Sequence, residues 1–193
     1  MKEVTQQHAG IDRFIAKTFA ENPEMKPCCS VGCSACCSEP VYAGEAEVLH
    51  ILECLTPEQT TLIKTKLPGW LAKTKPLMNQ NMPDATEYRK LNTPCVLLNN
   101  GLCSVYPRRP MGCRVWFAVE NPDHCELPYR THQKYAKFDT AKIVHASGDS
   151  LVFIDDRHVL DHLGNLLAEK LLGIKTPSAS RITDTLTSLT KQK

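Results

Sequence analysis

The segment Cys28–Cys37, "CCSVGCSACC", constrains the fold more than any other part of this sequence, because it holds five of the chain's ten cysteines within ten residues. The N-terminal segment "MKEVTQQHAGIDRF" lacks the continuous apolar stretch of a secretion signal. No window approaches the roughly 18 apolar residues of a membrane span. We therefore expect a cytoplasmic protein. Because thiols stay reduced there, clustered cysteines bind metal or carry redox chemistry more often than they form disulfides.

Composition places the chain among ordinary globular domains. Hydrophobic residues make up 42% of its 193 residues, which is enough to bury one core, and the formal net charge is only +2. A dedicated nucleic-acid binder carries a stronger basic excess. We predict a single domain over residues 1–193, of mainly helical α+β class. We expect it to bind metal ions and to have no membrane or nucleic-acid partner, and a protein partner or substrate stays open.

Hydrophobic spacing predicts three helices, each marked by apolar residues three or four positions apart. Their markers are Ile11, Phe14, Ile15 and Phe19, in a helix that ends before Pro23; Val48, Ile51, Leu52 and Leu55; and Leu160, Leu163, Leu167 and Leu171.

Local signals predict the remaining helical and connecting segments. "TPEQ", Thr56–Gln59, starts a further helix with threonine as N-cap, proline at N1 and glutamine at N3, and this helix runs to about Leu67. The polar segment Lys73–Ala85 contains two prolines and is expected to connect two halves of one domain. The chain from Thr131 onward is predicted to be mainly helical, with one short apolar run at Ser150–Ile154.

The segment Pro94–Tyr106, "PCVLLNNGLCSVY", predicts a β-hairpin around its Asn-Asn-Gly turn. With a two-residue loop, Leu98 pairs with Cys103, and Cys95 points to the opposite face because side chains alternate along a strand. With a three-residue loop, Leu97 pairs with Cys103, and Cys95 lies on the same face at a diagonal of about 7–8 Å. We favour the second register, because glycine then takes the position that needs a positive φ.

The opening cysteines have the spacing of metal ligands. Cys29, Cys33 and Cys36 lie close enough in sequence for one stretch of backbone to present several thiolates to zinc or to an iron–sulfur cluster. Cys36 and Cys37 are adjacent, so their side chains diverge and a disulfide between them would be strained. We predict that one of the pair binds with the N-terminal ligands and the other with ligands from the second half. The result would be two ions or one multinuclear cluster.

The later cysteines could complete such a set. Cys54 is expected to lie in the middle of a helix and to pack as a small hydrophobic residue. The others lie in turn-rich contexts next to proline, glycine or histidine, at Cys95, Cys103, Cys113 and Cys125. Four arginines are placed in sequence either to offset the negative charge of thiolates or to serve a structural role, namely Arg108, Arg109, Arg114 and Arg130.

These motifs form an ordered set: the cysteine cluster, "PC" at 94–95, "GLCSVY" at 101–106, "RP" at 109–110 and "CR" at 113–114. The set resembles the YkgJ-type family of small bacterial proteins, also called CxxCxxCC proteins, which are described as zinc- or iron-chelating domains. The resemblance spans about Cys28 to Cys125. It implies a metal-ligand set of Cys29, Cys33, Cys36, Cys37, Cys95, Cys103, Cys113 and Cys125. This sequence has three residues between Cys29 and Cys33 where the family name has two, so the first ligand is either Cys28 or Cys29.

The resemblance implies two classes of function, because relatives of this family include the flagellin lysine N-methylases. The first class is a structural or chelating metal module that binds zinc or iron. The second is a metal- or iron–sulfur-dependent enzyme, such as a protein lysine N-methylase-like or redox enzyme. The sequence contains no G-x-G-x-x-G turn or Walker loop for a nucleotide. The C-x3-C-x2-C spacing also occurs in radical SAM enzymes, but the strand–helix alternation of those enzymes does not follow here.

Several histidines and tryptophans are further candidates. His158 and His162 are four residues apart and could share an ion, but a surface or helix-capping role is favoured. Either His124 or His132 could replace Cys125 as a nitrogen ligand. Trp70 and Trp116 are expected in the core or as cover. No catalytic residue is predicted.

The predicted organisation is therefore a cysteine-rich metal-binding core at residues 28–125 with helical additions at 1–22 and 131–193. A hairpin and irregular cysteine-rich loops are organised around the metal. Because its ligands come from both halves of the chain, the metal should contribute folding free energy, and the metal-free protein should be loose or unfolded.

Overall fold

The computed structural model describes residues 2–24, 27, 29–78, 85–118, 135–137 and 161–174, and helices make up most of them. The helices are α1 (Lys2–Glu21), α2 (Glu45–Leu52), α3 (Pro57–Met78), α4 (Ala85–Lys90), α5 (Met111–Arg114) and α7 (Leu163–Leu172), with the 3-10 turns η1 (Ala35–Ser38) and η2 (Tyr106–Arg108). The strands are β1 (Tyr42–Ala43), β2 (Leu98–Asn99), β3 (Leu102–Cys103), β4 (Trp116–Ala118), β5 (Tyr135–Lys137) and β6 (Asp161–His162). They pair as the antiparallel ladders β1–β6, β2–β3 and β4–β5. The prediction of a mainly helical chain with small antiparallel strands is confirmed.

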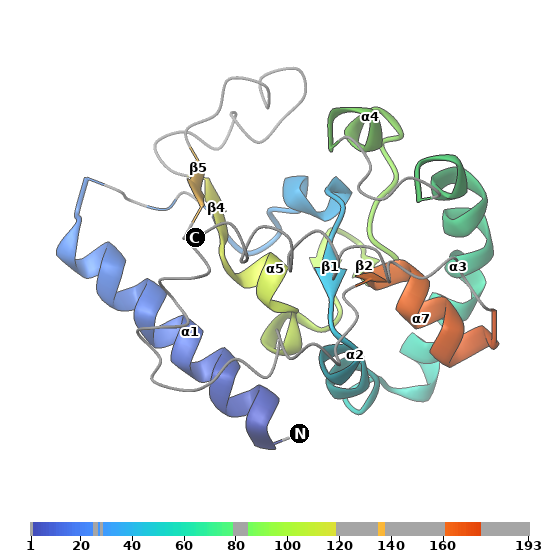
Figure 1. Cartoon of the computed structure of the whole chain (residues 1–193), viewed down its shortest axis with the longest axis horizontal. Helices are drawn as coiled ribbons and strands as arrows, with labels where there is room; N and C mark the ends of the chain where they lie inside the picture. The colour runs from blue at the N-terminus through green and yellow to red at the C-terminus, as the bar shows by residue number, and fades with distance from the viewer. Residues whose placement is uncertain are drawn as a thin grey trace, which may run out of the picture.

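The main hydrophobic core lies where α7 packs against both α2 and α3 (Figure 1). Ile51 of α2, Leu67 of α3 and Leu167 of α7 have no exposed surface. Burying each of these side chains contributes about 1.5–3 kcal/mol, so the three helices hold one another in place. This core supports the loops that carry Cys95 and Cys103, because both residues pack against its edge.

Helix α1 confirms the amphipathic helix predicted for the first twenty residues. Its inner face buries Ile11 and Ile15 with Val115 in a second, smaller cluster. An ion pair of 2.6 Å between Asp12 and the buried Arg114 ties the same face to α5. Figure 1 shows α1 running beside α5. The N-terminal helix is therefore anchored on the short helix that carries Cys113.

Helix α3 begins as predicted but continues beyond the predicted end at Leu67. The capping box is confirmed, because the Thr56 backbone N–H donates to Gln59 Oε1 at 2.9 Å and the Gln59 N–H donates to Thr56 Oγ1 at 3.2 Å. The helix then runs through Pro68 and Pro76 to Met78. The buried stripe of Ile63, Leu67, Trp70 and Thr74 continues across Pro68, which faces solvent. Burial of that stripe offsets the roughly 3 kcal/mol cost of an interior proline. The predicted connector at Lys73–Ala85 is therefore helical in its first part.

The predicted hairpin forms, but the favoured register was wrong. Leu98 lies opposite Cys103 and Asn99 opposite Leu102, so the loop has two residues. Asn100 and Gly101 have φ values of 48° and 75°. Two consecutive positive φ values are the requirement of a type I′ turn, whose twist matches that of the strands, and asparagine tolerates this conformation.

Other sequence predictions meet mixed outcomes. The helix marked by Leu163, Leu167 and Leu171 is confirmed as α7, whereas β5 and β6 are strands in a region predicted as mainly helical. Strand β6 pairs with β1, far away in sequence, and that partner could not be found from local periodicity. The run at 150–154 lies outside the described residues.

Cys54 lies in the turn after α2 rather than in the middle of a helix, because α2 ends at Leu52. It is half-buried and packs against the main core, so its predicted role as a small hydrophobic residue is confirmed. Among the described helices, none combines the length and the apolar character needed to cross a membrane.

Candidate metal centre

Five cysteines reach one region from four separate elements. They are Cys36 and Cys37 in η1, Cys95 in the turn before β2, Cys103 in β3 and Cys113 in α5. A backbone hydrogen bond of 2.7 Å from the Cys95 N–H to the Cys37 carbonyl joins the first half of the chain to the second. The next turn closes with a 3.0 Å bond from the Leu98 N–H to the Cys95 carbonyl. This turn explains why strand alternation does not separate Cys95 from Cys103: Cys95 precedes the strand instead of belonging to it.

Four of these thiols influence one another in every pairing, and we call Cys36, Cys95, Cys103 and Cys113 the four-thiol group. Burial raises the pKa of Cys95 to about 11, and the thiols of Cys103 and Cys36 add to the rise. Burial also raises the pKa of Cys103, again with a contribution from Cys36. For Cys113, burial and the thiols of Cys95, Cys36 and Cys103 raise the pKa well above its ordinary value. Negative charge on Cys95, Cys103 or Cys113 is therefore disfavoured by burial and by neighbouring thiolates unless a cation joins them.

Cys37 lies at the edge of the same group. A hydrogen bond with Cys36 is the largest cause of the raised pKa of its thiol, followed by burial and by the charges of Cys36, Cys95 and Cys113. The adjacent thiols thus contact each other in η1, and both lie within electrostatic reach of Cys95 and Cys113. The prediction that one of the pair binds with the N-terminal ligands and the other with ligands from the second half, in two ions or one multinuclear cluster, stays a prediction.

The first part of the cysteine cluster is arranged differently. Cys29 and Cys33 are exposed, and Val31 between them keeps 95% of its surface in solvent. We call the segment from Cys29 to Ser34 the cysteine arm. Gly32 within it has a φ of +89° and open space around it. Cys28 and Cys125, as well as His124 and His132, lie outside the described residues.

Positive charge beside the four-thiol group comes from Arg109 and from Lys66, whose charge lowers the pKa of Cys95. Arg109 is one of the predicted arginines. Its guanidinium lies 4.1 Å from the Tyr106 ring centroid, and it counteracts the burial that raises the pKa values of Cys103 and Cys113. Its Nε is buried and makes no hydrogen bond within the described part of the chain. Its charge is therefore available to thiolates.

The other described arginines are engaged elsewhere. Arg114 is 3% exposed and binds Asp12 and the carbonyls of Pro107 and Arg109. Arg108 donates to the His50 carbonyl at 2.9 Å. Of the predicted charge-balancing arginines, Arg109 is the one whose position fits the metal region, and Arg130 lies outside the described residues.

Sequence reasoning missed Glu47, a buried carboxylate that positions the Cys113 helix. Its Oε1 accepts from the Met111 N–H at 2.8 Å and contacts His8 Nε2 at 3.2 Å, and its Oε2 accepts from the Gly44 N–H at 3.1 Å. One side chain thereby links α1, the start of α2 and the start of α5. The available signal was a glutamate three residues after the glycine that starts a helix, which is the spacing of a capping box.

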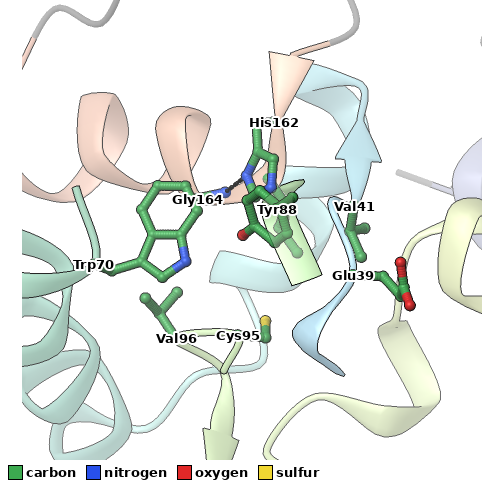
Figure 2. Close-up of a pocket in the computed structure, with 9 residues that line it drawn as sticks. Glu39, Val41, Trp70, Tyr88, Cys95, Val96, His162 and Gly164 are labelled. Atoms are coloured by element: carbon green, nitrogen blue, oxygen red, sulfur yellow. Dashed lines mark hydrogen bonds between the residues drawn. The ribbon is translucent and has the colours of Figure 1, made fainter. Parts of the chain in front are cut away.

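A small cavity borders the four-thiol group at Cys95 (Figure 2). Its walls include Trp70, Tyr88 and His162, each 4% exposed or less. The centre of a water molecule can occupy about 10 Å³ of this cavity, so the cavity holds about one water. In its present form, this cavity has no room for a larger ligand beside Cys95.

His162 is buried and caps the start of α7. Its Nδ1 accepts a hydrogen bond of 3.2 Å from the Gly164 N–H, drawn as the dashed line in Figure 2, and burial lowers its pKa to about 3. A neutral imidazole is required for this acceptor role. The predicted capping role is confirmed, and so is the predicted core position of Trp70. His158 and the side chain of Trp116 lie outside the described structure.

The thiols lie in one region, but they are not arranged around a common point. Within the described residues, no three histidine, cysteine, aspartate or glutamate side chains stand in an arrangement that could already hold a metal ion. None of the eight described cysteines forms a disulfide. The donor set nonetheless fits a soft metal, because clustered thiols from several elements are the ligands that zinc and iron prefer.

Comparison with known families decides the relationship that these cysteines suggest. Residues 27–141 match the CxxCxxCC family, described as "Putative zinc- or iron-chelating domain". The chain belongs to this family. The matched segment of the CxxCxxCC family contains every cysteine of the four-thiol group and most of the helices around it. Comparison with curated proteins and with solved structures found no match.

Proposed function

We propose that this chain binds one zinc or iron ion through the thiolates of Cys36, Cys95, Cys103 and Cys113. The proposal is supported by the backbone bond of 2.7 Å that joins Cys95 to Cys37 in η1, and by the effects of neighbouring thiols on the pKa values of Cys95, Cys103 and Cys113. Family membership supports metal chelation in general. The choice of four ligands is our inference from the effects of these thiols on one another's pKa values.

The arrangement makes metal binding favourable for an electrostatic reason. The raised pKa values of Cys95, Cys103 and Cys113 mean that these thiols resist ionisation, and a divalent cation removes that resistance because each thiolate then faces positive charge. Arg109 supplies a further positive charge on the same side. Binding therefore displaces protons from the thiols, and affinity should increase with pH.

The proposed role of the ion is structural or chelating. The group connects η1 to the hairpin and to α5, so a bound ion would hold both halves of the chain together. Four thiolates complete a tetrahedral shell and leave no open position. The cavity at Cys95 admits about one water, which is consistent with a closed site on that flank. When bound, zinc would supply crosslinking free energy, whereas iron would add the capacity for electron transfer.

Metal content and ligand substitution test this function. The full chain should be purified anaerobically, analysed for metal and sulfide, and reloaded with cobalt(II), whose absorption reports thiolate ligation and tetrahedral geometry. We expect one ion per chain with four thiolates, and loss of the cobalt spectrum in Cys95→Ser and Cys113→Ser. Cys54→Ser is the matched control, because Cys54 is half-buried but outside the group. Full metal binding by the Cys95→Ser and Cys113→Ser variants would refute the proposed ligand set.

A further inference from the structure

Lys66 joins the main core to the hairpin that carries the Cys103 thiol. It lies on α3 beside the buried Leu67 and is itself half-buried. Its Nζ donates a hydrogen bond of 2.6 Å to the carbonyl of Leu98, which is 32 residues away in the sequence. A charged hydrogen bond thus ties α3 to β2.

The Leu98 carbonyl needs a partner from outside the hairpin. Opposite residues in an antiparallel ladder alternate between pairs that exchange hydrogen bonds and pairs that do not. The Ser104 N–H donates to the Leu97 carbonyl at 3.0 Å, so the next pair, Leu98 and Cys103, is of the second kind. Both backbone groups of Leu98 therefore point away from β3. Its N–H donates to the Cys95 carbonyl at 3.0 Å, and its carbonyl accepts from the lysine.

Leu98 is also the residue at which the segments of two thiols meet. It closes the turn that begins at Cys95, and it lies opposite Cys103 in the ladder. A displacement of Leu98 would therefore shift both thiols. Because Lys66 holds the carbonyl of this residue, it limits such a displacement.

Lys66 supplies charge as well as a donor. Among the described residues, no carboxylate forms an ion pair with it. A half-buried ammonium is costly to desolvate unless negative charge lies nearby. Burial raises the pKa of Cys95, and the charge of Lys66 opposes that rise, while Arg109 does the same at Cys103 and Cys113. Four thiolates around a divalent ion carry negative charge in excess, and these cations offset it.

From these observations we infer that Lys66 is a positioning residue of the proposed metal centre. Its hydrogen bond fixes Leu98 between two of the ligands, and its charge, together with that of Arg109, favours a thiolate complex with excess negative charge. This inference rests on the proposed function. If the bound ion is iron, the ferrous complex is more negative than the ferric complex, so both cations favour the ferrous state.

The first test measures affinity for cobalt(II) in the full-length chain by competition with a chelator. Lys66→Met removes the charge and the donor but keeps most of the alkyl chain, and Lys66→Arg keeps both. Lys66→Met should bind about 10–100-fold more weakly than wild type, whereas Lys66→Arg should recover most of the affinity. Lys64→Met is the matched control, because Lys64 is an exposed lysine on the same helix, and its affinity should equal that of wild type.

A second measurement separates charge from position. In the iron-loaded chain, Lys66→Met should have a lower reduction potential than wild type, because loss of positive charge favours the less negative ferric complex. Lys66→Arg and Lys64→Met should keep the wild-type potential. A residue that only braced the hairpin would leave the potential where it is.

Three results would overturn the inference. If Lys66→Met binds cobalt(II) as tightly as wild type, Lys66 takes no part in the site. If Lys66→Met and Lys66→Arg lose affinity equally, neither the charge nor the donor is the reason. If the potential of Lys66→Met is unchanged, the charge does not act on the metal complex. Failure of the proposed function would look different, because wild type itself would then hold no thiolate-bound cobalt.

Discussion

Replacing Gly164 with alanine should destabilise this fold, even though alanine is the better helix former. An added β-carbon would lie 2.5 Å from Cη2 of Trp70, and 2.6 Å and 2.7 Å from two neighbouring ring atoms. Carbon atoms in favourable contact are about 3.5–4.0 Å apart, so the indole would have to move by roughly 1 Å. The ring is 4% exposed, and its centroid lies 4.8 Å from that of His162, so it has packed neighbours in place of free space.

The expected magnitude follows from two opposing effects. Forcing an extra methyl into a packed core costs about 1–3 kcal/mol. Replacing glycine by alanine in a helix returns up to about 1 kcal/mol. We therefore expect a net loss of about 1–2 kcal/mol in the free energy of unfolding, which for a chain of this length lowers Tm by roughly 2–8 °C.

Gly69→Ala is the matched control, because Gly69 lies in α3 with no atom within 4 Å of the added β-carbon. This variant should gain about 0.5–1 kcal/mol. Thermal unfolding followed by circular dichroism, with metal and with chelator, measures both variants. If Gly164→Ala raised Tm as Gly69→Ala does, the close contact between Trp70 and the start of α7 would not exist.

Three further predictions concern buried charge. Burial lowers the pKa of His162 to about 3, whereas the same side chain in the unfolded protein has a pKa of about 6.5. Between these two pH values the unfolded state binds more protons than the folded state. The free energy of unfolding should therefore fall by up to about 1.4 kcal/mol for each pH unit from pH 6.5 down to pH 3. His162→Asn should flatten that slope in urea titrations at several pH values, and an unchanged slope would contradict the assignment. Glu47→Gln should lower the free energy of unfolding, measured in urea, by about 1–3 kcal/mol. The two carboxylate oxygens accept from backbone N–H groups, and glutamine replaces one of these oxygens with an NH2 group that can only donate. An unchanged free energy of unfolding would refute the positioning role. Arg109→Gln should weaken metal affinity by about tenfold in chelator competition while Arg109→Lys retains most of it, and equal losses would show that charge is not the reason.

Those features of the fold that depend on nearby residues could be predicted from the sequence. The amphipathic α1, the start of α3 and the helix α7 each follow from periodicity or capping within a few residues. The length of α3 could not be predicted in this way. The helix continues beyond Pro68 because burial of Trp70 and Thr74 stabilises its second half. That burial depends on elements far away in sequence.

The hairpin illustrates the same division at the level of single residues. Its position was evident from the Asn-Asn-Gly turn, but its register depended on whether Asn100 would accept a positive φ, and it does so at 48°. With this register, Cys95 was predicted to point to the opposite face from Cys103. That consequence does not follow, because Cys95 lies in a backbone turn at 95–98 and not in the strand, so the alternation of side chains along the strand does not apply to it.

By itself, the sequence determined that this chain is a cysteine-rich, mainly helical member of a metal-chelating family, because thiol spacing and helical periodicity are local properties. Only the tertiary structure decided which thiols meet. Cys36 and Cys95 are far apart in sequence, yet the Cys36 thiol contributes to the raised pKa of Cys95. The physical reason is that long-range contacts bring these elements together: the Cys37–Cys95 backbone bond, the core of α2, α3 and α7, and the carboxylate of Glu47 beneath α5.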